Sequence, residues 1–425
     1  MKNTDNRLDF DVAIIGAGAA GMMAALFAAS EGAARVVLVE TTTDGGRKIL
    51  ISGGGRCNVL PSHFEPTQYV TSSSPNSLKK MLLSWPLREQ TLFFESVLGI
   101  PLALEEESGK LFPVSNRARD VRDALIRAID AAGVRRIHGA RAERLLEEDG
   151  MWRIALMNRE TGVAQEIRAG SVVLATGGLS VPQTGSDGGG LRMLEGLGHS
   201  LHTPYPALTP LLSEPPVHAD LAGVSLSVRL TASRDGSRFR TRGGFLFTHR
   251  GYSGPAVLNV SHLAATNPDQ EIRVAWAAMD ADEWSSALTA SPGKRISTIL
   301  RQALPERLAV RLLEEALVED TRVSGQLRRD ERLRLMEVLG RYALPWTGDE
   351  GYRKAEVTGG GVVLAEVNPT TMESRVREGL FLCGELLDAF GPIGGYNFAW
   401  AWATGRAAGR GAAARAVARA EAGVS

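Results

Sequence analysis

The sequence DVAIIGAGAAG, residues 11–21, decides the fold of this chain. A short apolar run leads into three glycines with the spacing Gly16-x-Gly18-x-x-Gly21. A helical segment follows, and a second apolar run, VVLVE, ends on Glu40. A strand, a glycine turn, a helix, a second strand and a terminal acid are typical, in that order, of a βαβ unit that binds a dinucleotide.

Each residue of this unit has a physical task. Gly16 makes the tight turn, Gly18 lets the backbone approach a pyrophosphate, and Gly21 lets the helix pack closely on the strand. The helix N-terminus offers free N–H groups and the positive end of a dipole to the phosphates. Glu40 follows Gly21 by 19 residues, where its carboxylate accepts ribose hydroxyls and repels a 2′-phosphate. The unit therefore favours FAD or NAD over NADP.

Composition indicates an ordinary soluble protein of two or three domains. The chain has 425 residues, of which 44% are hydrophobic and 23% charged, and its 48 basic and 48 acidic residues cancel. Residues 12–30 carry no charge, but three glycines and the strand-like opening argue against a membrane span. Two cysteines and an N-terminus without an apolar signal core predict a reducing, cytoplasmic location.

Charge is distributed unevenly along the chain. Residues 229–250 hold six arginines against one acid, Asp235. This cluster is either a set of solvated faces or a nucleic-acid patch. The sequence contains no cluster that predicts a metal site.

Further glycine-bearing segments indicate where the rest of the cofactor site lies. The triplet Gly53-Gly54-Gly55 lets a backbone come close to a flat or charged ligand. The strand of 172–178, VVLATGG, and the strand of 379–385, which ends on Gly384-Glu385, each deliver backbone to a ligand. Residues 391–395 form a turn before a long final helix, whose N-terminus would point at the cofactor.

The segment between these blocks differs in character and predicts an insertion. It begins with strand-rich, Arg-rich sequence and continues with amphipathic helices. We expect a first part of the cofactor domain at 1–192, a β-rich subdomain at 193–291, a helical subdomain at 292–343, a return strand at 344–355 and a second part of the cofactor domain at 356–425.

Five blocks together resemble the signature of the HI0933-like (YhiN) flavoproteins. They are GRKILISGGGRCNV, LFPVSNRARDV, FLFTHRGYSGPAVLNVS, AEVTGGGVVLAEVNPTTMESRV and CGELLDAFGPIGGYNFAWAWATGRAAG. The resemblance implies an α/β fold: a glutathione-reductase-type, Rossmann-like FAD-binding domain, interrupted by an insert with a β-barrel-like part and a helical part. It also implies FAD as the cofactor and, for some members, reduction of uridine to dihydrouridine in 23S ribosomal RNA.

The chemistry permitted by the residues is that of a flavin oxidoreductase. A thiol-disulfide reductase is disfavoured, because Cys57 has no cysteine near it and Cys383 lies inside an apolar strand. A second strand-GxGxxG-helix unit for a nicotinamide domain is also missing from the sequence. If NADH or NADPH is the reductant, it shares the flavin face with the substrate.

The predicted site has two catalytic candidates and a set of cofactor contacts. Cys57 is either a proton donor to a substrate carbon or a small packing residue. Arg56 either orients a substrate or neutralises the pyrophosphate. Tyr396 and Asn397 either touch the ring edge or cap and pack the final helix. The predicted cofactor contacts are Gly16, Gly18, Ala19, Ala20, Gly21, Glu40, Arg47, Lys48, Ser52, Gly53, Gly54, Asn58, Ala175, Thr176, Gly177, Gly384, Glu385, Gly394, Gly395, Tyr396 and Asn397.

Three functions follow from these observations. The first is an FAD-dependent reductase of an electron-poor C=C bond, with uridine in ribosomal RNA as the substrate that the resemblance implies. The second is a small-molecule NAD(P)H-dependent reductase or oxidase, with the insert as a lid. The third is a flavin-bound assembly factor without turnover.

Overall fold

The computed structural model describes residues 8–234 and 237–422. The chain forms two units: a cofactor unit, Met1–Pro204 with Val357–Ser425, and an inserted unit, Tyr205–Glu356. The predicted division at residue 192 falls inside helix α6 (Gly189–Gly196), which contacts strands of the cofactor unit. The inserted unit therefore begins beyond that helix.

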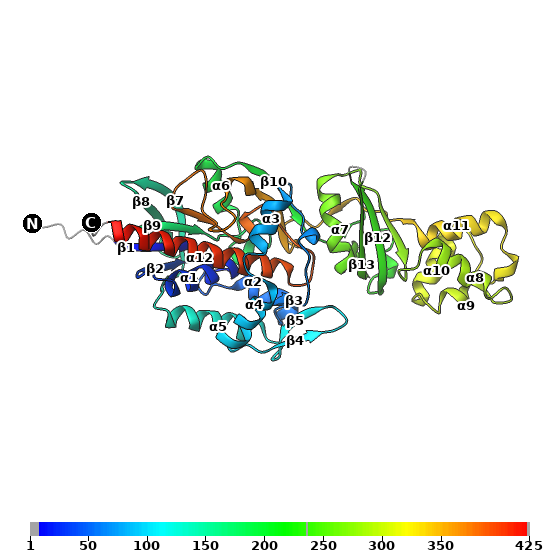
Figure 1. Ribbon diagram of the computed structural model, residues 1–425. Coiled ribbons are helices and arrows are strands. Elements are labelled where there is room, and N and C mark those ends of the chain that lie inside the picture. The colour runs from blue at the N-terminus through cyan, green and yellow to red at the C-terminus, as the bar shows by residue number, and fades with distance from the viewer. Residues whose placement is uncertain (1–7, 235–236, 423–425) are drawn as a thin grey trace, which may run out of the picture. The chain divides into compact units, whose positions relative to one another are not determined.

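A sheet with a parallel centre lies at the middle of the cofactor unit (Figure 1). Its order is β6-β2-β1-β9-β8-β7, with β19 also paired to β9. Ile15 of β1 lies opposite Val39 of β2 and Leu174 of β9, and Leu174 lies opposite Leu382 of β19. The carboxyl ends of these four strands therefore meet at one edge. The strands are β1 (Leu8–Ile15), β2 (Val36–Val39), β6 (Arg135–Ile137), β7 (Ala140–Glu148), β8 (Met151–Asn158), β9 (Ala164–Leu174) and β19 (Leu380–Leu382).

Strand β9 has two different neighbours along its length. Its first half pairs antiparallel with β8, which completes the predicted meander, and its second half pairs parallel with β1. The run from Ala169 to Leu174 is buried throughout. Burial on both faces explains why the stretch has no charged residue and ends in the apolar run VVL at residues 172–174.

Helices α1 (Ala19–Ser30) and α12 (Tyr396–Ala422) pack against one another beside the sheet (Figure 1). A side-chain carbon at Gly405 would lie 2.3 Å from the Ala20 carbonyl oxygen. One at Gly409 would lie 2.3 Å from the Ala24 carbonyl oxygen. Only glycine permits this close approach, so two glycines four residues apart fix α12 on α1.

Smaller elements complete the cofactor unit. A three-stranded sheet has the order β3-β5-β4, and β10 pairs with β18. The remaining elements are α2 (Arg47–Ile51), β3 (Leu60–Pro61), α3 (Pro75–Leu82), α4 (Leu87–Leu92), β4 (Leu102–Glu105), β5 (Lys110–Pro113), α5 (Ala118–Ala131), β10 (Leu201–Ala207) and β18 (Val357–Val362).

The inserted unit contains its own antiparallel sheet and its own core. The sheet order is β16-β15-β12-β13-β14-β11-β17, an open path rather than a closed ring of strand pairs. Helix α7 packs on β12 and β13, and four further helices follow β15. The strands are β11 (Leu211–Leu212), β12 (Ser225–Arg234), β13 (Ser237–Phe247), β14 (Gly251–Ser253), β15 (Ile272–Trp276), β16 (Tyr342–Ala343) and β17 (Gly348–Asp349). The helices are α7 (Pro255–Thr266), α8 (Ala281–Thr289), α9 (Ile296–Leu300), α10 (Glu306–Glu315) and α11 (Arg329–Gly340).

Within the described ranges, none of the helices combines the length and the apolar character needed to cross a bilayer.

Candidate functional site

The glycine turn after β1 leaves open space in front of helix α1. A side-chain carbon at Gly16, where φ is 104°, would lie 2.5 Å from the Ala175 carbonyl oxygen. One at Gly21 would lie 1.8 Å from the Gly16 carbonyl oxygen, whereas one at Gly18 would have no neighbour within 4 Å. Gly18 is the N-cap of α1, which has no side-chain cap. The first N–H groups of α1 are therefore available to an anionic ligand.

Glu40 stands at the end of β2 and keeps one position for a ligand. Its Oε2 accepts from the Ala17 N–H at 2.7 Å. Its Oε1 accepts from the Thr42 N–H at 2.7 Å and from the Thr42 hydroxyl at 2.8 Å. Each carboxylate oxygen has two lone pairs, so Oε2 can accept one more hydrogen bond. This capacity suits a ribose hydroxyl of a dinucleotide.

A second carboxylate, Glu385, closes a polar network just beyond β19. Its Oε1 accepts from the Ser180 hydroxyl at 2.5 Å and from the Thr358 N–H and hydroxyl at 3.0 and 2.9 Å. Its Oε2 accepts from Lys48 Nζ at 2.6 Å. Lys48 also donates to the Ser180 hydroxyl at 2.6 Å. As in Glu40, Oε2 retains one acceptor position, which suits a ribityl hydroxyl.

Sequence reasoning missed two members of this network, Ser180 and Thr358. The Thr358 hydroxyl accepts from the N–H groups of Leu179 at 2.7 Å and Ser180 at 3.1 Å. Thr358 therefore connects the loop after β9 to Glu385. The available signal was its place directly before three glycines at the start of GGGVVL, at residues 359–364.

Two segments that are far apart in the sequence meet just before α12. Gly53, Gly54 and the residue after them have positive φ angles, and a side-chain carbon at Gly54 would have no neighbour within 4 Å. With its amide turned to satisfy both groups, Asn58 accepts from the Gly395 N–H at 2.8 Å and donates to the Leu60 carbonyl at 3.2 Å. The segment after the predicted glycine loop therefore contacts the residue before α12.

The first turn of α12 is held mainly by contacts within the chain. Asn397 accepts from the Gly391 N–H at 2.8 Å and donates to the Gly391 carbonyl at 2.9 Å. The Tyr69 hydroxyl donates to the Tyr396 carbonyl at 2.8 Å, and the Tyr396 hydroxyl donates to the His63 carbonyl at 3.3 Å. These bonds favour capping and packing over contact with a ring edge.

Burial weighs against Cys57 as a proton donor. The residue is 0% exposed, and desolvation raises the pKa of its thiol to about 12, against a smaller opposing effect of the Ser52 hydrogen bond. A thiol enclosed by the chain reaches no substrate, so this conformation supports the packing role. Both cysteines are free and buried, and burial also raises the pKa of Cys383.

Arg56 is engaged with the hairpin of β4 and β5. Its Nη1 lies 3.0 Å from Glu105 Oε1, and its guanidinium carbon lies 4.0 Å from the centre of the Phe112 ring. The hydrogen bonds from Ser108 and Arg56 lower the pKa of Glu105, which keeps this pair charged. These contacts give Arg56 a role in anchoring the hairpin. Arg56 and the buried Cys57 therefore do not form a shared site that is open to a substrate.

Of the other predicted cofactor contacts, Arg47 is paired at the surface, whereas Thr176 and Gly177 lie in the turn after β9. Arg47 forms an exposed ion pair with Asp44 at 2.8 Å. The Thr176 hydroxyl is buried and has no hydrogen-bond partner among the described residues. A side-chain carbon at Gly190 would lie 1.9 Å from that hydroxyl, so Thr176 faces α6. Gly177, with φ at 74°, lets the chain turn after β9.

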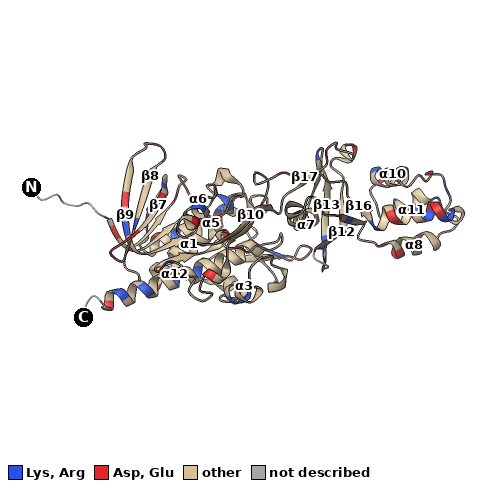
Figure 2. Ribbon diagram, turned by 90° about the horizontal axis from the view of Figure 1, so that it is seen from above, with Lys and Arg blue, Asp and Glu red and all other residues tan. Residues whose placement is uncertain are grey.

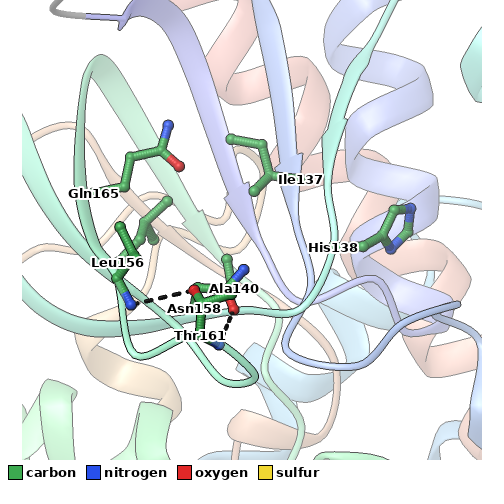
Figure 3. A pocket seen from close by; sticks show the side chains of 8 residues that line it. Ile137, His138, Ala140, Leu156, Asn158, Thr161 and Gln165 are labelled. Atoms are coloured by element: carbon green, nitrogen blue, oxygen red, sulfur yellow. Dashed lines mark hydrogen bonds between the residues drawn. The ribbon is translucent and has the colours of Figure 1, made fainter.

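A pocket of 260 Å³ lies at the start of the meander (Figure 3). Figure 3 shows Gln165, Leu156 and Asn158 grouped together, whereas the His138 ring points away from them. The Asn158 side chain accepts from the Thr161 N–H at 2.9 Å. This bond closes the turn before β9, so Asn158 is already engaged. Glu40 lies beside the pocket, since its N–H donates a hydrogen bond to the carbonyl of Ile137, which lines the pocket.

A Ser–His–Glu arrangement in the cofactor unit is structural. His199 Nδ1 lies 2.8 Å from Glu366 Oε2, and His199 Nε2 lies 2.9 Å from the Ser374 hydroxyl. That hydroxyl already accepts from the N–H groups of Val376 and Arg377. The His199 side chain is 0% exposed, and its burial lowers the pKa of the imidazole. The His199 ring and the Ser374 hydroxyl are enclosed by the chain, so this arrangement holds loops together.

Comparison with known proteins now places the chain. The family model described as "HI0933-like protein Rossmann domain" matches residues 10–411. The chain belongs to the HI0933-like family. It is 34% identical over 405 residues to the ribosomal RNA dihydrouridine synthase of Escherichia coli (strain K12), a match that covers 93% of this chain and 96% of the relative.

Two other similarities extend this result. A 3-dehydro-bile acid delta(4,6)-reductase of Clostridium scindens is 32% identical over 406 residues, covering 93% of this chain and 97% of that protein. The open conformation of a flavocytochrome c3 fumarate reductase has a TM-score of 0.51 at 19% identity, covering 96% of this chain and 79% of that one. The predicted family, Rossmann-type fold, FAD cofactor and class of FAD-dependent oxidoreductase are confirmed.

Proposed function

We propose that this chain reduces an electron-poor C=C bond of uridine in 23S ribosomal RNA and so produces dihydrouridine. The observation that carries the proposal is the relative from Escherichia coli, which is named a ribosomal RNA dihydrouridine synthase and aligns over 96% of its own length. The bile-acid relative is named for reducing C=C bonds as well. One reaction type therefore accounts for both names: a hydride and a proton add across a double bond conjugated to a carbonyl.

The residues of the cofactor unit fit FAD at several independent points. The open space at Gly18 and the uncapped N-terminus of α1 suit the pyrophosphate. Glu40 and Glu385 each keep one acceptor position for a sugar hydroxyl. FAD held by these residues would supply hydride chemistry, with NADH or NADPH as the proposed reductant.

The protein's own part in the reaction is to hold and orient. Lys48 and Glu385 form an ion pair with side chains that are 26% and 18% exposed, so the pair is shielded from water on most sides. Thr358 fixes the loop after β9 against the same carboxylate. These bonds preorganise the sugar-binding groups before the cofactor arrives, which lowers the entropic cost of binding.

The test is direct. The FAD-loaded protein is incubated with NADH or NADPH and with 23S rRNA transcribed in vitro, and nucleosides from the digested RNA are analysed by mass spectrometry. We expect dihydrouridine at a defined position and nicotinamide oxidation in equal amount. Absence of dihydrouridine with both reductants, from protein whose flavin is reduced by one of them, would refute the RNA substrate.

The bile-acid relative supports a second candidate, reduction of a conjugated steroid ketone. It predicts nicotinamide oxidation that depends on an added 4,6-dien-3-one and does not respond to RNA. If neither substrate reoxidises the reduced flavin, the assembly-factor alternative gains support.

A further inference from the structure

The two longest strands of the inserted unit, β12 and β13, form a hairpin with two different faces. Val228, Leu230 and Phe245 point inward, are buried and join the core of the unit. Helix α7 covers this side: a side-chain carbon at Gly243 would lie 3.6 Å from the Ala256 nitrogen. Because side chains alternate along a strand, the intervening residues all lie on the opposite, outward face.

The outward face of β12 and β13 is rich in arginine and has no acidic residue among its described positions. Arg238, Arg240 and Arg242 lie on it in alternation along β13, and all three are exposed. The residues directly opposite them on β12 are Ser233, Thr231 and Arg229. We call the outward-facing residues of the two strands the arginine face: Ser225, Ser227, Arg229, Thr231, Ser233, Arg238, Arg240, Arg242, Gly244 and Leu246.

Three of these arginines differ from Arg229 in their surroundings. Within the described ranges, the side chains of Arg238, Arg240 and Arg242 form no ion pair and no hydrogen bond. Arg229, by contrast, lies 3.5 Å from Glu283 and 3.7 Å from Asp280. Helix α11 carries both basic and acidic residues (Figure 2), and Arg334 pairs with Asp330 at 3.0 Å. Arg329 and Arg332 of that helix also form no ion pair among the described residues, so what distinguishes β13 is that three such arginines lie together on one face.

This arrangement carries a cost that packing does not explain. Arg229 and Arg242 are cross-strand neighbours, and like charges directly opposite one another destabilise a sheet. Residues two apart in a strand are about 6.6–6.8 Å apart, comparable to the separation of successive phosphates along a polynucleotide strand. Guanidinium groups bind phosphate oxygens in bidentate geometry, and the flanking serine and threonine hydroxyls add donors.

We propose that the arginine face binds the phosphodiester backbone of the RNA substrate. The inference rests on the proposed function for the identity of the substrate, and on charge complementarity for the site. The arginines contact phosphates and not bases, so they supply affinity without sequence preference. An acidic protein would need carboxylates in place of phosphates, and it is an alternative outcome of the test.

The experiment compares two triple variants of the full-length, FAD-loaded protein. In the first, Arg238, Arg240 and Arg242 are all changed to glutamine. In the matched control, Arg295, Arg329 and Arg341 are changed to glutamine; these are exposed arginines of the same unit, outside the arginine face. Both variants lose the same charge. Binding to a fluorescent single-stranded fragment of 23S rRNA is measured by anisotropy over a range of salt concentrations.

We expect the arginine-face variant to bind RNA roughly 10- to 100-fold more weakly at low salt than the unaltered protein. Its slope of log K against log salt concentration should fall by about 2, because each lost phosphate contact on a single strand removes about 0.7. The control should keep the affinity and slope of the unaltered protein to within roughly twofold. Reduction of the flavin by NADH or NADPH should be equal in all three proteins, which shows that each is folded and loaded.

Two results would overturn the inference. The first is an arginine-face variant that binds RNA with unchanged affinity and slope. The second is displacement of the RNA by polyglutamate at equal charge concentration, which would favour an acidic protein. Failure of the proposed function looks different: the unaltered protein would bind RNA through this face and form no dihydrouridine.

Discussion

Replacing Glu385 with glutamine tests the core of the cofactor site. The carboxylate accepts bonds from Lys48, Ser180 and Thr358. If the amide oxygen of glutamine takes the place of Oε1, its NH₂ group faces Lys48 Nζ across a gap that is 2.6 Å in the unaltered protein. Two donors then oppose one another, and the position offered to a ribityl hydroxyl becomes a donor.

The magnitude follows from these lost bonds. A hydrogen bond to a charged group contributes about 1.5–3 kcal/mol, and partial exposure of Lys48 and Glu385 places this one near the lower limit. The FAD contact adds about 1 kcal/mol. The Lys48 bond is lost from the apoprotein and from the complex alike, so only the FAD contact changes the Kd. We therefore expect the Kd for FAD to rise roughly fivefold, since about 1.4 kcal/mol corresponds to a factor of ten. In the assay, the apoprotein is titrated with FAD, and binding is measured as the quenching of flavin fluorescence.

Glu373→Gln provides a matched control. Glu373 accepts from the Gly379 N–H at 2.9 Å, before β19 begins, whereas Glu385 follows the end of that strand. The two carboxylates therefore serve opposite ends of β19, and the control should lower stability without changing the Kd for FAD. A folded Glu385→Gln apoprotein that binds FAD as tightly as the unaltered protein would refute the assigned role of this carboxylate.

The other predictions concern a glycine pair, a thiol and an imidazole. Gly18→Ala should leave the unfolding midpoint of the apoprotein nearly unchanged but weaken FAD binding at least about tenfold. Gly21→Ala should instead lower the free energy of unfolding by several kcal/mol, because the new methyl group meets the Gly16 carbonyl. Thermal melts with and without FAD distinguish the two. Cys57→Ala should retain the rate of substrate reduction within about twofold and lose about 1–2 kcal/mol of stability. If the variant's flavin is reduced normally but substrate reduction is largely lost, Cys57 is the proton donor after all. Burial lowers the folded-state pKa of His199 below 6.5, so the unfolded state binds more protons and stability falls as pH drops below that value. Urea midpoints at pH 5 and 7 should differ less in His199→Gln than in the unaltered protein, and equal differences would contradict this assignment.

The sequence predicted those parts of the structure that depend on local backbone geometry. Gly16 and Gly21 have close neighbours and Gly18 has open space around it, as their spacing predicts. The tight turn, the approach of a ligand and the packing of the helix on the strand are all determined within these few residues. The acids Glu40 and Glu385 were found because each follows a recognisable apolar strand.

Contacts between distant segments were harder to predict. Thr358 and Ser180 join Glu385 through tertiary packing over 27 and 205 residues of sequence, and no spacing rule covers such a contact. Burial of Cys57 was also out of reach, because a cysteine beside a polar loop reads equally well as reactive or packed. The predicted start of the insert at residue 193 falls inside α6, whereas the inserted unit begins at Tyr205.

The packing of α12 on α1 through Gly405 and Gly409 has a consequence for biosynthesis. During translation, α1 and the glycine turn before it leave the ribosome hundreds of residues before the helix that packs on α1. Until α12 is made, the apolar side of α1 has no permanent cover, and the inserted unit, which has its own core, can mature first. Cofactor capture is then a late event in the life of the polypeptide, and a chain interrupted before its final helix should emerge colourless.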